Sequence, residues 1–401
     1  MMRLSTADFY ARSLASMQRR ESLIAQVQHQ LGNGLKLENP VDDPAGAANV
    51  SRFNAALAAG ASFDATINRA NAAMAAEEGA LISVGDVLQR VRELTLQGVS
   101  STQSVHSRTG IVAEVLALRG QLLAIANSRG ADGEHLFAGY SVDTPPFTQA
   151  AGTVTYVGDA GQRTLEIGPG NRVAIADAGS TVFAGARAGN GDFVTTAGAA
   201  NAGTLLVGST ALSGSLVPDD YTVTFTVAPS GAMSYAVTGV TSGPVASGSF
   251  NPGASVVFNG VTLATAGVPA DGDTLSVRPA GRQDVFSVMT EIASALALPD
   301  GTPQAVAGQA NRLNRALEAL DQQMAHVQTV RADIGWRMKA AEVAADASAG
   351  ATLQIQKALS DVQDLDYAEA STRLAKNLTG LQAVQETFSR LSNLSLFNYL
   401  R

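Results

Sequence analysis

Apolar residues follow helical spacing near the N-terminus of the chain. They recur every three, four or seven positions between residues 10 and 31, which is the narrow stripe of a coiled-coil helix. The members of this stripe are Tyr10, Leu14, Met17, Ile24 and Leu31. Gly32-Asn33-Gly34 follows. Because glycine and asparagine tolerate left-handed backbone, the pattern predicts that the helix ends there.

The segment LENPVDDPAGAANV at 37–50 predicts a connector between two helices. Pro40 stops a helix, whereas Asp42 or Asp43 can cap a new helix with Pro44 at its first position. The alanine-rich run that follows supplies this helix, and further helical runs are expected at about 81–99 and 111–126. Helix capping explains the aspartates better than a metal site, because their surroundings lack the spacing of a calcium loop.

Strand alternation replaces helical spacing between about residues 147 and 281. YTVTFTV at 221–227 places its large apolar residues on one face and its threonines on the other. Asn259-Gly260 is a two-residue hairpin signal, and it pairs 256–258 with 261–263. The region is therefore predicted to be an antiparallel β domain, either a sandwich or a small barrel.

Heptad spacing returns from about residue 282. A first run reaches from Leu313 to Met338, and a second seam begins at Tyr367. The interface candidates in this second seam are Tyr367, Leu374, Leu381, Val384, Phe388 and Leu391. The predicted fold class is therefore α+β with discontinuous domains: a long helical coiled coil or bundle built from both termini, with an inserted sandwich-like antiparallel β domain.

Composition narrows the possible functions. The net charge is −8 and only four of the 401 residues are lysine, so nucleic-acid binding through phosphate contacts is not expected. The absence of cysteine excludes disulfides and thiolate sites. No cleavable secretory signal is visible, and no uninterrupted apolar stretch approaches the roughly 18 residues of a membrane span. We therefore expect no membrane insertion.

No constellation of residues indicates catalysis. The four histidines are far apart in sequence, and neither a P-loop nor a nucleophile elbow occurs. We expect no catalytic residue, no cofactor and no metal. The terminal seams are more informative: one narrow stripe buries too little apolar surface to offset the entropy of ordering a helix. The ends are therefore predicted to be unfolded in the isolated monomer and to fold on assembly, and Phe388→Ala is predicted to leave the melting curve of the monomer unchanged.

Several segments resemble a known family. RLSTADFYARS through DDPAGAA, residues 3–48, is similar to the start of the flagellin-like axial proteins of the bacterial flagellum. GEHLFAGYSVDTPPF at 133–147 resembles, more narrowly, the hook–filament junction proteins, which are the third hook-associated proteins of this family. The segments at 330–338 and 360–400 resemble the C-terminal helices of the family, with Trp336 where a small residue is more usual.

The resemblance implies a layout and a set of partners. Residues 1–40 and 361–401 would be terminal helices of an inner tube, 41–146 and 282–360 a helical rod domain, and 147–281 an outward-facing β domain. The implied partners are a hook-side hook-associated protein, flagellin on the filament side, copies of the chain in a ring, and a cytoplasmic export chaperone. The implied location is the extracellular flagellum, reached without a cleaved signal peptide.

Three alternatives remain open at this stage. The nearest is a flagellin-type filament subunit. The chain could also be an adhesin whose β domain binds glycans, and an enzyme is the last possibility. The leading interpretation is a structural adaptor that joins hook-side and filament-side proteins. Under it, the break from Pro40 to Pro44 is expected to be a hinge that absorbs a mismatch of angle between the inner-tube helix and the rod.

Overall fold

The computed structural model describes residues 6–37, 40–41, 43–99, 105–299 and 301–399. The chain divides into two compact units. One unit consists of residues 1–65 and 345–401, and the other of residues 66–344. Helices α2 (Pro44–Val99) and α6 (Pro303–Gln363) contribute residues to both units.

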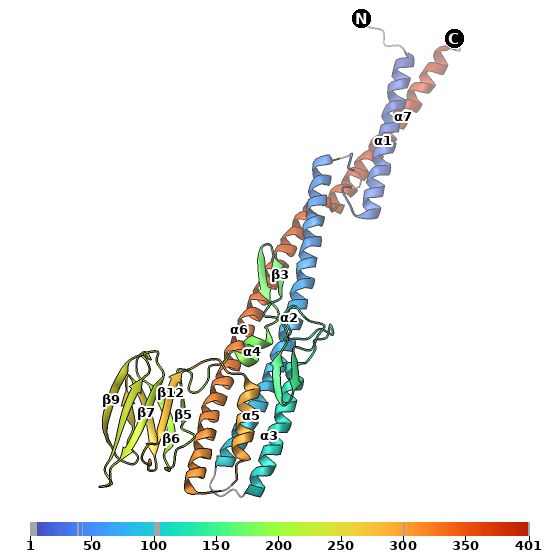
Figure 1. The fold of residues 1–401 in the computed structure, drawn as a ribbon. Coiled ribbons are helices and arrows are strands. Elements are labelled where there is room, and N and C mark those ends of the chain that lie inside the picture. The colour runs from blue at the N-terminus through green and yellow to red at the C-terminus, as the bar shows by residue number, and fades with distance from the viewer. Residues whose placement is uncertain (1–5, 38–39, 42, 100–104, 300, 400–401) are drawn as a thin grey trace. The chain divides into compact units, whose positions relative to one another are not determined.

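The first unit contains the two terminal helices. Helices α1 (Thr6–Asn33) and α7 (Tyr367–Tyr399) lie side by side and run antiparallel (Figure 1). The predicted end of the first helix at Gly32-Asn33-Gly34 is confirmed, since Gly34 has a φ of 73° directly after α1. The unit is completed by the first part of α2 and the last part of α6.

The helical part of the second unit is formed by α2, α3 (Val105–Ala126), α5 (Val285–Leu296) and α6. Their fully buried side chains include Leu88, Leu122 and Leu320. Residues 44–99 form one helix of 56 residues, of which the predicted run at 81–99 is only the last part. The alanine-rich first half of α2 has few large apolar residues, so the continuity of the helix is not visible in the periodicity.

Helix α3 differs from the expectation on membrane spans. His106–Ala126 is long and apolar enough to cross a membrane by length and composition, with a mean hydropathy of 1.5, and 28% of that stretch is buried. Its two buried arginines donate hydrogen bonds to backbone carbonyls of the same unit: Arg108 to Leu298 and Arg119 to Phe286 and Gly152. These contacts join α3 to α5, to the segment just after it and to the turn between β1 and β2.

The chain leaves helical structure at Ala126, where the predicted helical run at 111–126 also ends, and so before the predicted β region begins at 147. Residues 127–146 form turns, in which Gly133 and Gly139 have positive φ. Two hairpins and a short helix follow: β1 (Phe147–Ala150) with β2 (Thr153–Tyr156), β3 (Thr164–Gly168) with β4 (Asn171–Ala174), and α4 (Gly179–Ala184). Phe147 contacts Phe183 and Phe286, so this segment packs on α5 through an aromatic cluster.

The remaining strands form a sandwich. One sheet has the order β5 (Phe193–Ala197), β12 (Thr274–Pro279), β7 (Tyr221–Val227), β8 (Met233–Gly239), β9 (Gly243–Phe250). The other has the order β10 (Val256–Phe258), β11 (Val261–Ala266), β6 (Leu206–Leu212). The inner faces of both sheets share one core, which includes Phe225 and Leu263. The predicted register, Val256 opposite Leu263 and Phe258 opposite Val261, is confirmed.

The sandwich is an insertion whose two ends lie together. Arg187 and Arg282 form an isolated antiparallel bridge just outside the sandwich. The backbone N–H of Ala188 donates to Gly281 O at 2.9 Å, and that of Gln283 donates to Ala186 O at 3.0 Å. The α+β fold with an inserted antiparallel domain is therefore confirmed.

The edge of β6 is covered by polar side chains of α6. Asn311 Oδ1 accepts from the backbone N–H of Val207 at 2.8 Å, and Asn311 Nδ2 donates to Leu205 O at 2.8 Å. Asn314 Nδ2 donates to Val207 O, and Thr210 donates to Glu318 on the same helix. The two asparagines supply backbone hydrogen bonds that a neighbouring strand would otherwise make.

Candidate assembly interface

The two predicted apolar seams meet inside the chain. The rings of Tyr10 and Phe388 pack edge to face, with centroids 5.2 Å apart. At the other end of the pair, Val27 packs with Leu365 and Ala370. Leu31 and Leu374 are partly buried against this cluster. The α1 seam and the α7 seam therefore contact each other along the antiparallel pair.

The predicted interface residues differ in exposure. Ile24 is buried, at 8% exposed. Tyr10, Met17, Leu31, Leu374, Leu381, Val384 and Phe388 are half-buried. Leu14 and Tyr367 are exposed, at 53% and 57%. The side chain of Leu391 lies outside the described residues. Most of the seam is thus covered by the opposite terminal helix rather than left open.

Other leucines flank the seam and are open to a partner. Leu23 on α1 is 46% exposed, and Leu378 on α7 is 42% exposed. Together with Leu14 and Tyr367 they are the large apolar side chains that the described part of the pair leaves exposed. These four exposed side chains are the candidates for contacts with other subunits.

The connector at 37–50 is a capped helix start. Asp43 Oδ1 accepts from the backbone N–H groups of Ala45 at 3.1 Å and Gly46 at 2.9 Å. Pro44 is the first residue of α2, and Pro40 lies exposed in the preceding turn. Asp42 lies outside the described residues. The proline and aspartate at the start of α2 therefore have the geometry of a helix N-terminus.

A second interruption between helices lies beside the connector at 37–50, and it was not predicted from the sequence. The chain passes from α6 to α7 at 364–366. Leu35 and Asp364 form an antiparallel bridge, and the backbone N–H of Leu365 donates to Gly34 O at 2.9 Å. Asp366 Oδ1 accepts from the N–H groups of Ala368 and Glu369 at 2.9 and 3.0 Å. The sequence does contain a signal for this helix start. Asp366 is followed three residues later by Glu369, which is the pattern of a helix N-cap.

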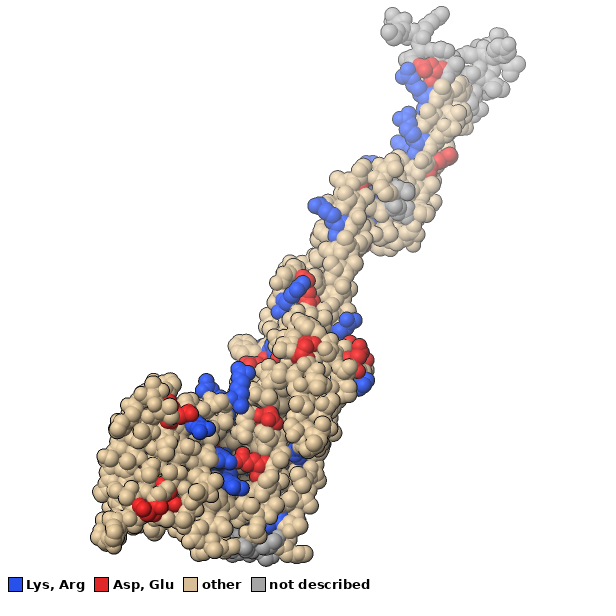
Figure 2. Space-filling model, viewed as in Figure 1, with Lys and Arg blue, Asp and Glu red and all other residues tan. Residues whose placement is uncertain are grey.

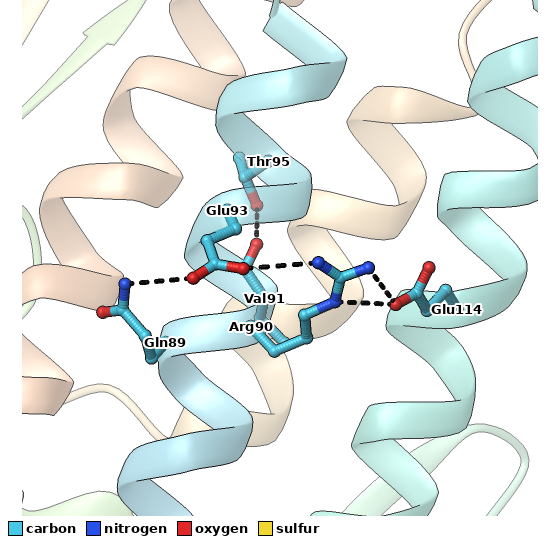
Figure 3. Close-up of polar contacts among 6 residues, drawn as sticks. All are labelled: Gln89, Arg90, Val91, Glu93, Thr95 and Glu114. Atoms are coloured by element: carbon cyan, nitrogen blue, oxygen red, sulfur yellow. Dashed lines mark hydrogen bonds and ion pairs between the residues drawn. The ribbon is translucent and has the colours of Figure 1, made fainter.

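Charged side chains in the helical part of the second unit form ion pairs between helices. Arg90 on α2 contacts Glu114 on α3 at 2.8 Å and Glu93 on its own helix at 3.3 Å (Figure 3). The hydrogen bonds with Glu114 and Glu93 raise the pKa of Arg90. Gln89 also donates to Glu93 (Figure 3). The carboxylates therefore act as structural partners of a cation.

The surface offers little fixed charge. On the face shown in Figure 2, basic and acidic residues are interspersed among uncharged ones. The sandwich, residues 193–279, contains no lysine and a single arginine, Arg278 near the end of β12. Among the described residues, no group of three or more histidine, aspartate or glutamate side chains could hold a metal ion.

A cavity of about 620 Å³ lies where the sandwich meets α5 and α6. Its lining includes Asn311, Arg315 and Glu291. Arg315 forms an ion pair with Glu291 and donates to Thr196 Oγ1, while Asn311 bonds to β6 as described above. These polar groups already have partners within the chain, so their arrangement fits attachment of the sandwich to the helices.

Family models match both ends of the chain. The model of the bacterial flagellin N-terminal helical region matches residues 4–142, and that of the C-terminal helical region matches residues 317–400. The flagellar hook-associated protein 3 of Escherichia coli K12 is 26% identical over 182 residues. This match covers 45% of the chain and 57% of the relative, so the chain spans little more than half of the length of this curated relative.

Solved structures match over more of the chain. FlgL from Xanthomonas campestris is 31% identical with a TM-score of 0.71, and the match covers 77% of this chain and 99% of that one. The flagellar hook-associated protein 3 of Legionella pneumophila is 27% identical with a TM-score of 0.75, covering 78% and 98% of the two chains. The resemblance seen in the sequence is confirmed. The chain belongs to the bacterial flagellin family and, within it, to the FlgL group of hook-associated proteins.

Proposed function

We propose that this chain is a structural adaptor of the bacterial flagellum that joins the hook side to the filament. The observation that carries this proposal is the likeness to FlgL structures over almost their whole length, at 31% identity for the Xanthomonas protein. The paired terminal helices support it, because they carry exposed leucines suited to contacts between subunits. The role requires binding surfaces and no reaction, so we propose no catalytic residue.

The proposed layout assigns a task to each part of the chain. Residues 1–40 and 361–401 enter the inner tube, 41–146 and 282–360 form the rod, and within 147–281 the sandwich at 193–279 faces outward while 147–184 pack on the rod helices. The exposed Leu14 and Tyr367 then contact neighbouring subunits directly, whereas the half-buried seam residues hold α1 on α7. The breaks at 40–44 and 364–366 allow the terminal pair and the rod to take different angles.

The proposed partners follow from the position in the flagellum. They are a hook-associated protein on the hook side, flagellin on the filament side and copies of this chain in a ring. A cytoplasmic chaperone would keep the terminal helices apart before export. Export through the flagellar apparatus without a cleaved signal peptide completes the proposal.

Deleting the gene tests the adaptor role. Cells without the chain are expected to build hooks and to release flagellin into the medium, because the filament has no attachment site. Complementation with the intact gene is the control and should restore attached filaments. If the cells instead lose the filament protein itself, the chain is a filament subunit and the proposal is wrong.

A further inference from the structure

Glu77 is a buried carboxyl group near the middle of α2. It is 1% exposed, and its Oε1 accepts a hydrogen bond from the backbone N–H of Asp177 at 3.0 Å. Its Oε2 is buried and has no hydrogen-bond partner among the described residues. An ionised carboxylate in this position would have one oxygen without water or a donor, which is unfavourable.

The cation beside Glu77 is already paired with another acid. Arg337 on α6 forms an ion pair with Asp177 Oδ2, and it also donates to Ala174 O at 3.4 Å. Asp177 Oδ1 accepts from Gln162 Nε2 at 2.7 Å. The charged groups that act on Glu77 are thus one arginine and one aspartate, on two different elements. A single cation cannot neutralise two buried carboxylates.

The charge balance favours a protonated Glu77. Burial, and after it the negative charge of Asp177, raises the pKa of Glu77 from 4.5 to about 8. Arg337 and the N–H of Asp177 oppose this increase only in part. Glu77 therefore carries a proton in the folded chain at neutral pH, although an exposed glutamate would not.

Asp177 lies near the end of a segment that contacts both α2 and α6. We call residues 159–178 the strap; it contains β3, β4 and the turns around them. The strap contacts α2 through Asp177 and Glu77, and α6 through Asp177, Ala174 and Arg337. Opening of the strap would remove the N–H of Asp177 from Glu77 and admit water to the buried carboxyl.

We propose that Glu77 is a proton-linked latch for the strap. The strap is closed on α2 and α6 while the Glu77 carboxyl holds a proton, and opening of the strap releases that proton to solvent. No assignment of function to the chain is needed for this inference, because it concerns the attachment of one segment to two helices.

The coupling predicts a defined pH dependence. Between a pKa of 4.5 in the open form and about 8 in the closed form, the open population should rise with pH, by at most about tenfold per unit. Above about pH 8 both forms have lost the proton, so the population should level off. Below the lower value both forms are protonated and no dependence on Glu77 remains.

Amide hydrogen exchange of the full chain tests the latch. Exchange of peptides that cover 164–176 is measured for wild type and Glu77→Gln at several pH values from about 5 to 9, under conditions in which exchange reports the open population. The rate for wild type is divided by the rate for Glu77→Gln at each pH, which cancels the intrinsic chemical exchange rate. This ratio is expected to rise at least tenfold from pH 5 to pH 8 and then to level off. A ratio that stays constant would overturn the proposal.

Two further variants keep the test decisive if Glu77→Gln folds poorly. Asp177→Asn removes the neighbouring negative charge but keeps Glu77. When each strap exchange rate is divided by the intrinsic rate of an unstructured peptide at the same pH, the levelling point of the open population should move to lower pH. An unchanged levelling point would contradict the latch. Glu78→Gln is the matched control one position along α2, where the carboxylate pairs with Arg331 at 2.7 Å. It should retain the pH dependence of the wild type.

Discussion

Tyr10 and Phe388 pack edge to face, with their ring planes at 85°, and so join the first helix of the chain to the last. The seam pattern alone predicted an unfolded tail in the monomer and no effect of Phe388→Ala on its melting. The contact within the chain changes that expectation for the variant. Phe388→Ala should reduce the stability of the α1–α7 pair, because it removes an aromatic partner of Tyr10.

The size of this effect is measurable with a double-mutant cycle. Tyr10→Ala, Phe388→Ala and the double variant are compared by urea unfolding followed through helical circular dichroism. Aromatic pairs contribute about 0.5–1.5 kcal/mol beyond area burial, so a coupling energy of that order is expected. Additive single effects would show that the rings do not meet in the isolated chain. In that case the original expectation of unfolded ends would stand.

The two aspartate caps give a second prediction. Asp43→Ala and Asp366→Ala each remove an acceptor for two backbone N–H groups at a helix start. Each should lower the free energy of unfolding of the first unit by about 1 kcal/mol. Asp43→Asn and Asp366→Asn are the controls and should retain most of the stability, because asparagine also caps. Equal losses for alanine and asparagine would argue against capping.

The proline pair gives a third prediction. Replacing Pro40 and Pro44 together by alanine relaxes the backbone restraint between α1 and α2. If the break absorbs a mismatch of angle, attachment of the filament or motility under load should be impaired. Pro145→Ala, an exposed proline in the turns after α3, is the control. Normal attachment in the double variant would show that these prolines do not serve as a hinge.

Asn311 gives a fourth prediction, on the attachment of the sandwich. Asn311→Ala leaves the Val207 N–H and the Leu205 carbonyl without their side-chain partner at the edge of β6. The expected cost is about 1–3 kcal/mol of unfolding free energy for the second unit. Asn314→Ala removes one hydrogen bond to the same strand and should cost less. A larger loss in Asn314→Ala would contradict the assignment of Asn311 as the main contact.

Two ion pairs of different burial give a fifth prediction. Arg90 and Glu114 have side chains 49% and 43% exposed, so solvent screens this pair and Arg90→Ala should change stability little. Arg331 and Glu78 are 28% and 26% exposed, and two nitrogens of Arg331 contact Oε1 of Glu78. Arg331→Ala should therefore cost more. Thermal melts at low and high salt should show that the stability change of Arg90→Ala becomes smaller still at high salt, because salt screens exposed charges.

Local signals explain which parts of the fold were predictable. The hairpin at Asn259-Gly260 was predicted to the residue, because turn chemistry and alternation lie within a few positions of each other. The end of α1 was visible for the same reason. In contrast, the alanine-rich part of α2 has a weak apolar pattern, so its continuity with the predicted run at 81–99 was not visible.

Contacts between distant segments explain what was not predictable. Asn311 bonds to Val207, 104 positions earlier, and Glu77 accepts from Asp177, 100 positions later. Neither residue stands out in a periodic pattern, because its role depends on which strand or turn the fold places beside it. The interface candidates were found by spacing, but spacing could not show that the opposite terminus covers them.

The paired ends at Arg187 and Arg282 have a consequence for how this chain can change over evolutionary time. Because the chain leaves the helices and returns to them through adjacent backbone positions, the length and fold between those positions do not alter the path of the helices. A short turn could close the gap, and a larger domain could be accommodated equally well. Such an exchange would leave the path of the chain through the helices unchanged, but it would remove the hydrogen bonds that Asn311 and Asn314 of α6 make to β6.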